Sequence, residues 1–264
     1  QGTEEPFEAL FTQGMVTHPA YVTQAPLPRD GSVRRDGSTT YAGTKPVYYL
    51  PEDVDLDRRV VKSTGESIEV LSAIKMSKSK KNVVDPDDII ARYGADTARW
   101  FVISDSPPER DVEWTPEGAE AVARHLSRVH RIASDIARAD RPSNAHDAAL
   151  AKATARAIHE VTQGIEGFGF NKAVAKLYEF TGTINKSDAG ADARRDAMRV
   201  LAQLMAPMVP HLAEEVWSML GGEGFVVLRS TAKNDTISRI VPSLDSGAVV
   251  TTIKNTVDNV VTEF

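Results

Sequence analysis

The stretch IKMSKSKKNVVDPDDIIARYGADTARWF, from Ile74 to Phe101, separates two parts of the chain that differ in composition. Four lysines lie within positions 75–81, in a chain of 264 residues whose formal net charge is -6. This lysine cluster is too short and too polar for a core helix. Asp85 and Pro86 follow it as an N-cap and a first helical residue, and Gly94 closes the helix that they begin. We therefore expect a basic loop that leads into helices.

Downstream of the loop, the apolar residues have the spacing of amphipathic helices. After Thr115 they recur three and four positions apart, which places them on one helix face: Ala119, Val122, Leu126, Val129, Ala133 and Ile136. We expect further helices over about 145–165, 170–186, 190–206 and 211–220. Pro207 and Pro210 should separate the last two. Several amphipathic helices with short connections predict a helical bundle.

Upstream of the loop, residues 16–73 are rich in turn formers, above all PLPRDGSVRRDGSTTYAGTKP at 26–46. Short β-prone pieces lie at 46–50, 58–62 and 67–71. We expect a small β-rich insertion with long loops. The predicted fold class is mainly α, with this insertion before the loop, the bundle after it and an uncertain tail. The expected boundaries are 1–15, 16–73, 74–114, 115–221 and 222–264.

Composition narrows the class of protein. The chain has no cysteine, which excludes disulfides and thiolate metal sites, and its six histidines are scattered, so we expect no zinc site. No apolar run approaches the roughly 18 residues of a membrane span, and the first residues do not resemble a signal peptide. We expect a cytoplasmic protein with no membrane partner. The acidic balance argues against indiscriminate nucleic-acid binding but allows a local basic patch.

The lysine cluster suits phosphate oxygens, because lysine ammonium groups are compact charges. When a carboxylate attacks the α-phosphorus of a nucleotide, negative charge grows on the departing pyrophosphate. A lysine placed there stabilises the transition state more than the ground state. The alternative is a solvated surface, which is the commoner role of short Lys/Ser runs. Composition alone favours that alternative.

The lysine cluster and the residues around it resemble those of a known protein family. KMSKS at 75–79 is identical to the signature loop of class I aminoacyl-tRNA synthetases, and NVVDPDDIIARYGADTARWF after it is similar to the leucine, isoleucine and valine enzymes. Within this group FTQGMV at 11–16, VVDPDDII and SPPERDVEW at 106–114 most resemble leucyl-tRNA synthetases. NKAVAKLYEF at 171–180 and LMAPMVPHLAEEVW at 204–217 resemble the helical anticodon-binding domain of that family. Residues 16–73 resemble its small leucine-specific insertion.

The resemblance implies roles for the loop residues. Lys78 would hold the ATP phosphates with help from Lys75, Met76 would pack the loop down, and Ser77 and Ser79 would supply hydrogen bonds. The implied reaction joins leucine to tRNA(Leu) through leucyl-adenylate. ATP is the implied substrate, Mg²⁺ is expected with it, and no metal site is expected in this chain. Lys81 stands where glycine is common in the family, at some cost in backbone freedom.

Parts of the family pattern are missing from this sequence. No His-Ile-Gly-His type motif is present, and the leucine pocket, most of the parallel sheet and the editing domain would lie upstream. The chain therefore resembles a C-terminal portion, which we expect to be inactive alone and to act with an N-terminal catalytic and editing portion. The tail after Gly222 has no recognisable counterpart. Two alternatives stay open: a fragment of an isoleucyl-, valyl- or methionyl-tRNA synthetase, and a catalytically dead tRNA-binding module.

Four arginines share one stripe of the helix after Thr115: Arg124, Arg128, Arg131 and Arg138. Because the resemblance places this helix in the tRNA-binding bundle, we interpret the stripe as a contact to tRNA phosphates. The alternative is a solvated face on which Asp135 pairs locally.

The remaining candidates have plainer interpretations. We expect core packing rather than base stacking for the large aromatic residues: Trp100, Phe101, Trp114 and Trp217. His211 is expected to cap or pack, and Asp96 to cap its own helix. Helix-dipole stabilisation explains the first-turn carboxylates without a magnesium site: Asp85, Asp87 and Asp88.

Overall fold

The computed structural model describes residues 12–33 and 39–226 of the chain. They divide into two compact units. One unit takes in Met15–Asp88 and Asp111–Thr115 and holds the strands; the other takes in Ile89–Arg110 and residues 116–226 and holds the helical bundle. The expected tail from 227 onward lies outside the described residues, as does the expected edge of a packed element before residue 12.

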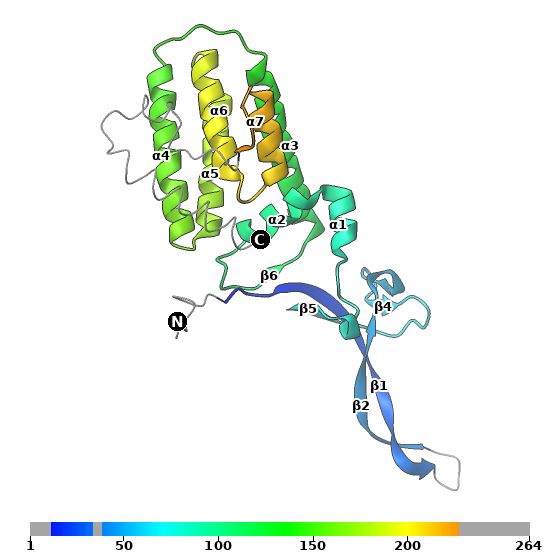
Figure 1. The fold of residues 1–264 in the computed structure, drawn as a ribbon. Helices are drawn as coiled ribbons and strands as arrows, with labels where there is room; N and C mark the ends of the chain where they lie inside the picture. The colour runs from blue at the N-terminus through cyan, green and yellow to red at the C-terminus, as the bar shows by residue number, and fades with distance from the viewer. Residues whose placement is uncertain (1–11, 34–38, 227–264) are drawn as a thin grey trace, which may run out of the picture. The chain divides into compact units, whose positions relative to one another are not determined.

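The strand unit is built around one long strand. β1 (Val16–Val33) lies between β5 (Glu69–Lys75) on one side and β2 (Thr39–Tyr49) on the other, and both pairings are antiparallel. A short strand, β6 (Val112–Glu113), pairs in parallel with the start of β1. In Figure 1, β1 and β2 continue together as a ribbon of two strands beyond the end of β5.

That ribbon corrects the prediction of long loops over 26–46. β1 pairs with β2 as far as Val33↔Thr39, although Pro26, Pro28 and Pro46 lie within the paired strands. Beyond Val22, β1 has β2 as its single partner, and β2 is an edge strand. A proline without an N–H is tolerated at such an edge because no second ladder needs the donor. Turn-forming residues therefore did not exclude a strand here.

A second, smaller group of elements follows the ribbon. A 3₁₀ turn over Pro51–Asp53 leads into β3 (Val54–Asp55), which pairs with β4 (Val60–Val61). The buried side chains of Tyr21, Val54, Val61 and Ile68 form its core. The β-prone piece predicted at 58–62 thus contributes only two strand residues.

Helices make up most of the rest of the described chain, which confirms the mainly α fold class. The bounds are α1 (Pro86–Tyr93), α2 (Ala95–Ser104), α3 (Pro116–Ala137), α4 (Asp147–Glu166), α5 (Phe170–Lys186), α6 (Ala191–Met205) and α7 (Pro210–Met219). Asp85 caps α1 as expected, since its Oδ1 accepts a hydrogen bond from the Asp87 N–H at 2.9 Å. All six apolar positions predicted for α3 are buried.

The bundle packs α4 against α5 and α6, and α3 against α2, α6 and α7. Its centre holds side chains with less than 2% exposure, among them Leu177 and Ile184 of α5 and Met198 and Leu201 of α6. Trp100, Phe101 and Trp217 are buried in the helical unit, and Trp114 is buried in the strand unit. The expectation of packing for these aromatic side chains is confirmed.

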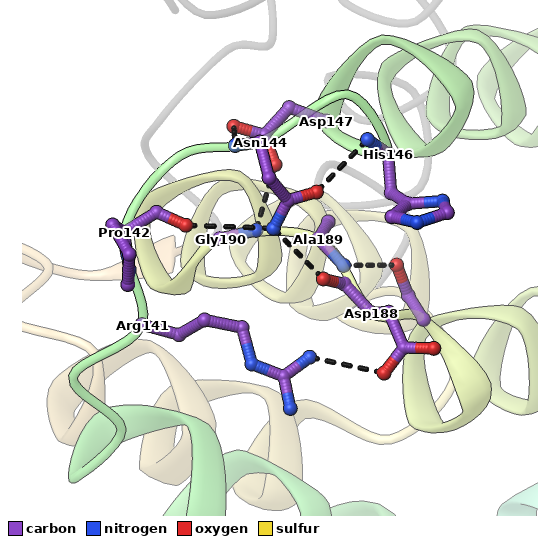
Figure 2. A network of polar contacts seen from close by, with 9 residues as sticks. Arg141, Pro142, Asn144, His146, Asp147, Asp188, Ala189 and Gly190 are labelled. Atoms are coloured by element: carbon purple, nitrogen blue, oxygen red, sulfur yellow. Dashed lines mark hydrogen bonds and ion pairs between the residues drawn. The ribbon is translucent and has the colours of Figure 1, made fainter.

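Two connections meet at one end of the bundle and are joined by polar contacts (Figure 2). Asn144, between α3 and α4, donates to the Asp188 carbonyl oxygen at 2.9 Å, and Arg141 forms an ion pair with the Asp188 carboxylate at 3.2 Å. The Gly190 N–H donates to Asp147 Oδ1 at 2.7 Å, and this bond is the main reason that the pKa of Asp147 is lowered. These contacts tie the start of α4 to the start of α6.

The expected role of Asp96 is wrong. Gly94 is the N-cap residue of α2 and makes no side-chain cap. The Asp96 carboxylate instead accepts hydrogen bonds from His211 Nδ1 and the Leu212 N–H, both at 2.8 Å. Asp96 therefore caps α7 across the bundle, because the first N–H groups of a helix have no partner inside it. His211 is bonded to this cap, but its side chain is 77% exposed rather than packed.

No helix in the described part of the chain is long and apolar enough to cross a membrane.

Candidate functional site

The lysine cluster forms a tight loop in the strand unit. β5 ends at Lys75, a 3₁₀ turn covers Lys78–Lys80, and Lys81 follows it at φ 53° and ψ 30°. This is the left-handed region that favours glycine. The family resemblance predicted a cost at position 81, where glycine is common, and this left-handed backbone gives the cost its physical origin.

The loop carries its cations outward. Lys75, Lys78 and Lys81 are exposed, while Met76 and Ser77 are half-buried. The Ser77 and Ser79 hydroxyl oxygens lie 2.8 Å apart and form a hydrogen bond. The chain therefore brings three ammonium groups and a hydroxyl pair together on one short exposed segment, where phosphate oxygens could reach them.

A buried amide fixes the base of this loop, and the sequence reasoning missed it. Asn82 is 2% exposed. Its Nδ2 lies within hydrogen-bond distance of the carbonyl oxygens of His18, Ile74 and Lys75, and its Oδ1 accepts from the Ser77 N–H at 2.9 Å. Asn82 follows a run of lysines and serines, so it looks like one more exposed polar residue. Nothing in the composition of this stretch predicts that its side chain is buried.

His18 of β1 lies beside Asn82. Burial of the ring lowers the pKa of His18, while a hydrogen bond with the Asn82 backbone and the Glu113 carboxylate act in the opposite direction. Its Nδ1 is buried and has no hydrogen-bond partner among the described residues. The loop thus rests on a polar contact between β1 and the segment that follows the lysines.

The four arginines of the predicted stripe lie on the exposed face of α3, in the helical unit. The first and last of them each form an ion pair, with Glu120 at 3.9 Å and with Asp135 at 3.4 Å. The middle two, Arg128 and Arg131, form no ion pair within the described residues. Local pairing therefore accounts for half of the stripe and leaves two cations available to an anionic partner.

The opposite, buried face of α3 holds an aromatic cluster that the sequence reasoning also missed. The His125 ring lies 3.8 Å from the Tyr178 ring and 5.8 Å from the Trp100 ring, measured between centroids, and Trp100 Nε1 donates to the Tyr178 hydroxyl at 3.2 Å. Burial, and next the charge of Arg128, lower the pKa of His125 to about 4. The burial of His125 could have been predicted, because position 125 lies between Val122 and Val129 on the apolar face of the helix.

The first-turn carboxylates of α1 have no metal-like arrangement. Among the described residues, no group of three or more His, Cys, Asp or Glu side chains could hold a metal ion.

Comparison with known proteins defines the class. Residues 71–115 match the family model of class I tRNA synthetases for isoleucine, leucine, methionine and valine. Residues 147–262 match the model of the anticodon-binding domain of tRNA ligases. The chain thus combines the signature-loop region of a class I synthetase with an anticodon-binding domain.

Individual relatives narrow this class. Over 88% of its length the chain is 62% identical to a leucine–tRNA ligase of Cereibacter sphaeroides, and over 86% it is 56% identical to one of Dinoroseobacter shibae. The chain belongs to the leucine–tRNA ligase family. It spans about a quarter of the length of these curated relatives, 25% in both cases.

A solved structure agrees with this assignment. The crystal structure of a ternary complex of LeuRS, tRNA and LeuAMS from Agrobacterium radiobacter K84 is 29% identical to the chain, with a TM-score of 0.53. The match covers 58% of this chain and 21% of that one.

Proposed function

We propose that this chain is part of a leucine–tRNA ligase, in which the loop at 74–82 binds the phosphates of ATP and the helical bundle binds tRNA(Leu). The observation that carries the proposal is the exposed Lys78 on a short loop whose base is fixed. Family membership supports it, because the loop sequence KMSKS lies within the matched class I region. Isoleucyl-, valyl- and methionyl-tRNA synthetases are disfavoured by the 62% identity to a leucine enzyme.

The reaction proposed for the whole ligase has two steps. The leucine carboxylate attacks the α-phosphorus of ATP, which is bound with Mg²⁺, and pyrophosphate leaves; the leucyl group then passes to the terminal ribose of tRNA. Lys78, assisted by Lys75, neutralises the charge that develops on the departing pyrophosphate. Ser77 and Ser79 supply hydrogen bonds to the phosphates, and Met76 packs the loop down.

The regions divide this work between them. Residues 16–73 correspond to the leucine-specific insertion, 74–114 to the loop and its connecting helices, and 115–221 to the tRNA-binding bundle. Residues 1–15 continue the catalytic segment, and the predicted tail over 222–264 falls largely within the 147–262 match to the anticodon-binding domain. Leucine binding and editing belong to other parts of the ligase, so the chain alone should not activate leucine.

Substitution of Lys78 tests the role of the loop. We would insert the matched segment of this chain into the full-length Cereibacter sphaeroides ligase and measure leucine-dependent exchange of pyrophosphate into ATP. Lys78→Ala should lower the exchange rate about 100- to 1,000-fold, the usual effect of removing one preorganised group that stabilises transition-state charge, with the KM for leucine unchanged.

Lys62→Ala is the matched control. Lys62 is an exposed lysine of the same unit, and its ammonium group donates to the Glu52 carbonyl oxygen at 2.8 Å. This substitution should leave exchange unchanged. If Lys78→Ala were as active as Lys62→Ala, the proposed role of Lys78 would be wrong. Exchange by the isolated chain would contradict its expected inactivity and would favour a complete site over a tRNA-binding module.

A further inference from the structure

We propose that Asn82 is a positioning residue, which closes the lysine loop at its base and so fixes where Lys75 and Lys78 stand. The inference rests on the proposed function of the loop. Asn82 lies outside the five-residue signature KMSKS. It makes its contacts through a buried, uncharged side chain.

The amide of Asn82 is the one side-chain type that satisfies all of its surroundings. Nδ2 faces three carbonyl oxygens, at 3.0 Å from His18, 3.4 Å from Ile74 and 3.5 Å from Lys75. Oδ1 faces the Ser77 N–H at 2.9 Å. An aspartate would supply no donor to the carbonyl groups at neutral pH, and an aliphatic residue would leave all four backbone groups without this partner.

These bonds connect the two ends of the loop. Lys75 is the last residue of β5, and Ser77 lies just before the 3₁₀ turn. The Asn82 side chain bonds to the backbone of both residues. The segment from Lys75 to Asn82 is thereby closed into a ring by a side chain. The bond to His18 fastens this ring to β1, the central strand of the sheet.

Lys81 makes the closure possible. Its left-handed backbone, at φ 53°, reverses the chain directly before Asn82, and its N–H donates to the Lys78 carbonyl oxygen at 3.2 Å. The loop therefore presents its lysines outward while the next side chain points back into the base. A displacement of about 1 Å in a reacting arrangement can cost about 100-fold in rate, so fixing the backbone of Lys78 has a catalytic consequence.

Hydrogen exchange tests the closure in this chain itself. In Asn82→Ala the Ser77 amide should exchange about tenfold faster, since it loses its acceptor. The Lys81 amide should also exchange faster, because the ring that holds the turn is open. Lys78→Ala should leave the Ser77 amide unchanged, and the amides of the helical bundle should keep their protection in both variants. Unchanged exchange at Ser77 in Asn82→Ala would overturn the proposal.

Kinetics of the full-length ligase with the inserted segment test the positioning. Asn82→Ala should lower the exchange rate about 10- to 100-fold, as is usual for groups that orient a functional residue. Asn82→Asp keeps the side-chain size and should lose a similar factor at pH 8. Its rate relative to the unchanged enzyme should partly recover as the pH falls to 6, because burial at position 82 raises the pKa of the introduced carboxyl group and its protonated form regains one donor.

The double variant Lys78→Ala/Asn82→Ala separates positioning from loss of fold. If Asn82 acts through Lys78, the double variant should lose less than the product of the two single losses. Losses that multiply would overturn the proposal. A large loss in Lys78→Ala with less than a twofold loss in both Asn82 variants would also overturn it, while leaving the proposed function intact. No loss in Lys78→Ala would instead contradict the proposed function itself.

Discussion

His125 is an imidazole on the apolar face of α3, 8% exposed and in contact with the rings of Trp100 and Tyr178. Its Nε2 is buried and has no hydrogen-bond partner among the described residues. A charged imidazolium would be costly there, and this cost appears as a pKa of about 4, below the ordinary value of 6.5. The fold therefore requires the neutral form of this residue.

The pH dependence of stability follows from that shift. Because the folded-state pKa of His125 is lowered, its stabilising contribution is complete above pH 6.5 and is lost as the pH falls towards about 4. Each pKa unit corresponds to about 1.36 kcal/mol, so the free energy of unfolding should fall by about 2 kcal/mol between pH 7 and pH 5. Urea denaturation at the two pH values measures this difference.

His125→Phe keeps a ring in the cluster and removes the titration, so the difference between pH 7 and pH 5 should shrink in this variant. His130→Phe is the control, because His130 is exposed on the same helix. It should keep the pH dependence of the unchanged chain. Equal pH dependence in the two variants would contradict the assignment to His125.

At the scale of residues, the sequence predicted a residue's role correctly where neighbouring backbone determines that role. It failed where a residue distant in the sequence determines it. The cap at Asp85 and the helix end at Gly94, which has φ 85°, depend on local backbone and were predicted. Asp96 looked like a local cap, but its partners lie 115 and 116 positions away. The burial of Asn82 likewise depends on β1, 64 positions earlier.

At the scale of elements, the helices followed from periodicity because one buried face fixes a spacing of three and four residues. The expected ranges 170–186 and 190–206 compare with α5 over Phe170–Lys186 and α6 over Ala191–Met205. The hairpin of β1 and β2 did not follow, because its strands extend beyond the third strand and none of the side chains described at 24–27 and 43–49 is buried. Because these residues show no alternation of buried and exposed side chains, the turn-forming residues among them predicted loops instead of strands.

Two glycines within helices give opposite predictions for one substitution. A Cβ at Gly164 of α4 would lie 2.9 Å from the Ala173 Cβ and 3.1 Å from its Cα, whereas a Cβ at Gly182 of α5 would meet nothing within 4 Å. Gly164→Ala should therefore lower the free energy of unfolding by about 1–3 kcal/mol through overpacking. Gly182→Ala should raise it by about 0.5–1 kcal/mol, since alanine favours the helix.

Urea denaturation of the two variants under the same conditions checks this pair, each serving as the control for the other. Shifts of the same sign would mean that the contact between α4 and α5 does not depend on the missing side chain at Gly164.

At the scale of the whole molecule, an acidic chain with a net charge of -6 should bind tRNA only through local basic surface. Arg128 and Arg131 are the two stripe residues without an ion pair in the described part of the chain. If both contact phosphates, Arg128→Ala/Arg131→Ala should weaken tRNA(Leu) binding and reduce the slope of log K against log salt concentration by about 2.

The matched control removes two cations from another helix of the same unit. Lys152 and Arg156 lie on α4, and Lys152→Ala/Arg156→Ala changes the net charge by the same amount. Filter binding of labelled tRNA(Leu) from about 50 to 200 mM salt measures both slopes. An equal reduction by the control pair would mean that net charge, rather than the stripe, governs binding.

The order of folding should follow from the cap that Asp96 places on α7. The Leu212 N–H in the first turn of α7 donates to the carboxylate of Asp96 in α2. The Arg99 side chain of α2 donates in turn to the Pro207 and Met208 carbonyl oxygens, which precede α7, both at 3.0 Å. Contacts so far apart in sequence are slow to form, because a long loop must close first. During synthesis, α2 leaves the ribosome more than a hundred residues before α7 does, so the closing step of this bundle must wait for the last helix in the described part of the chain.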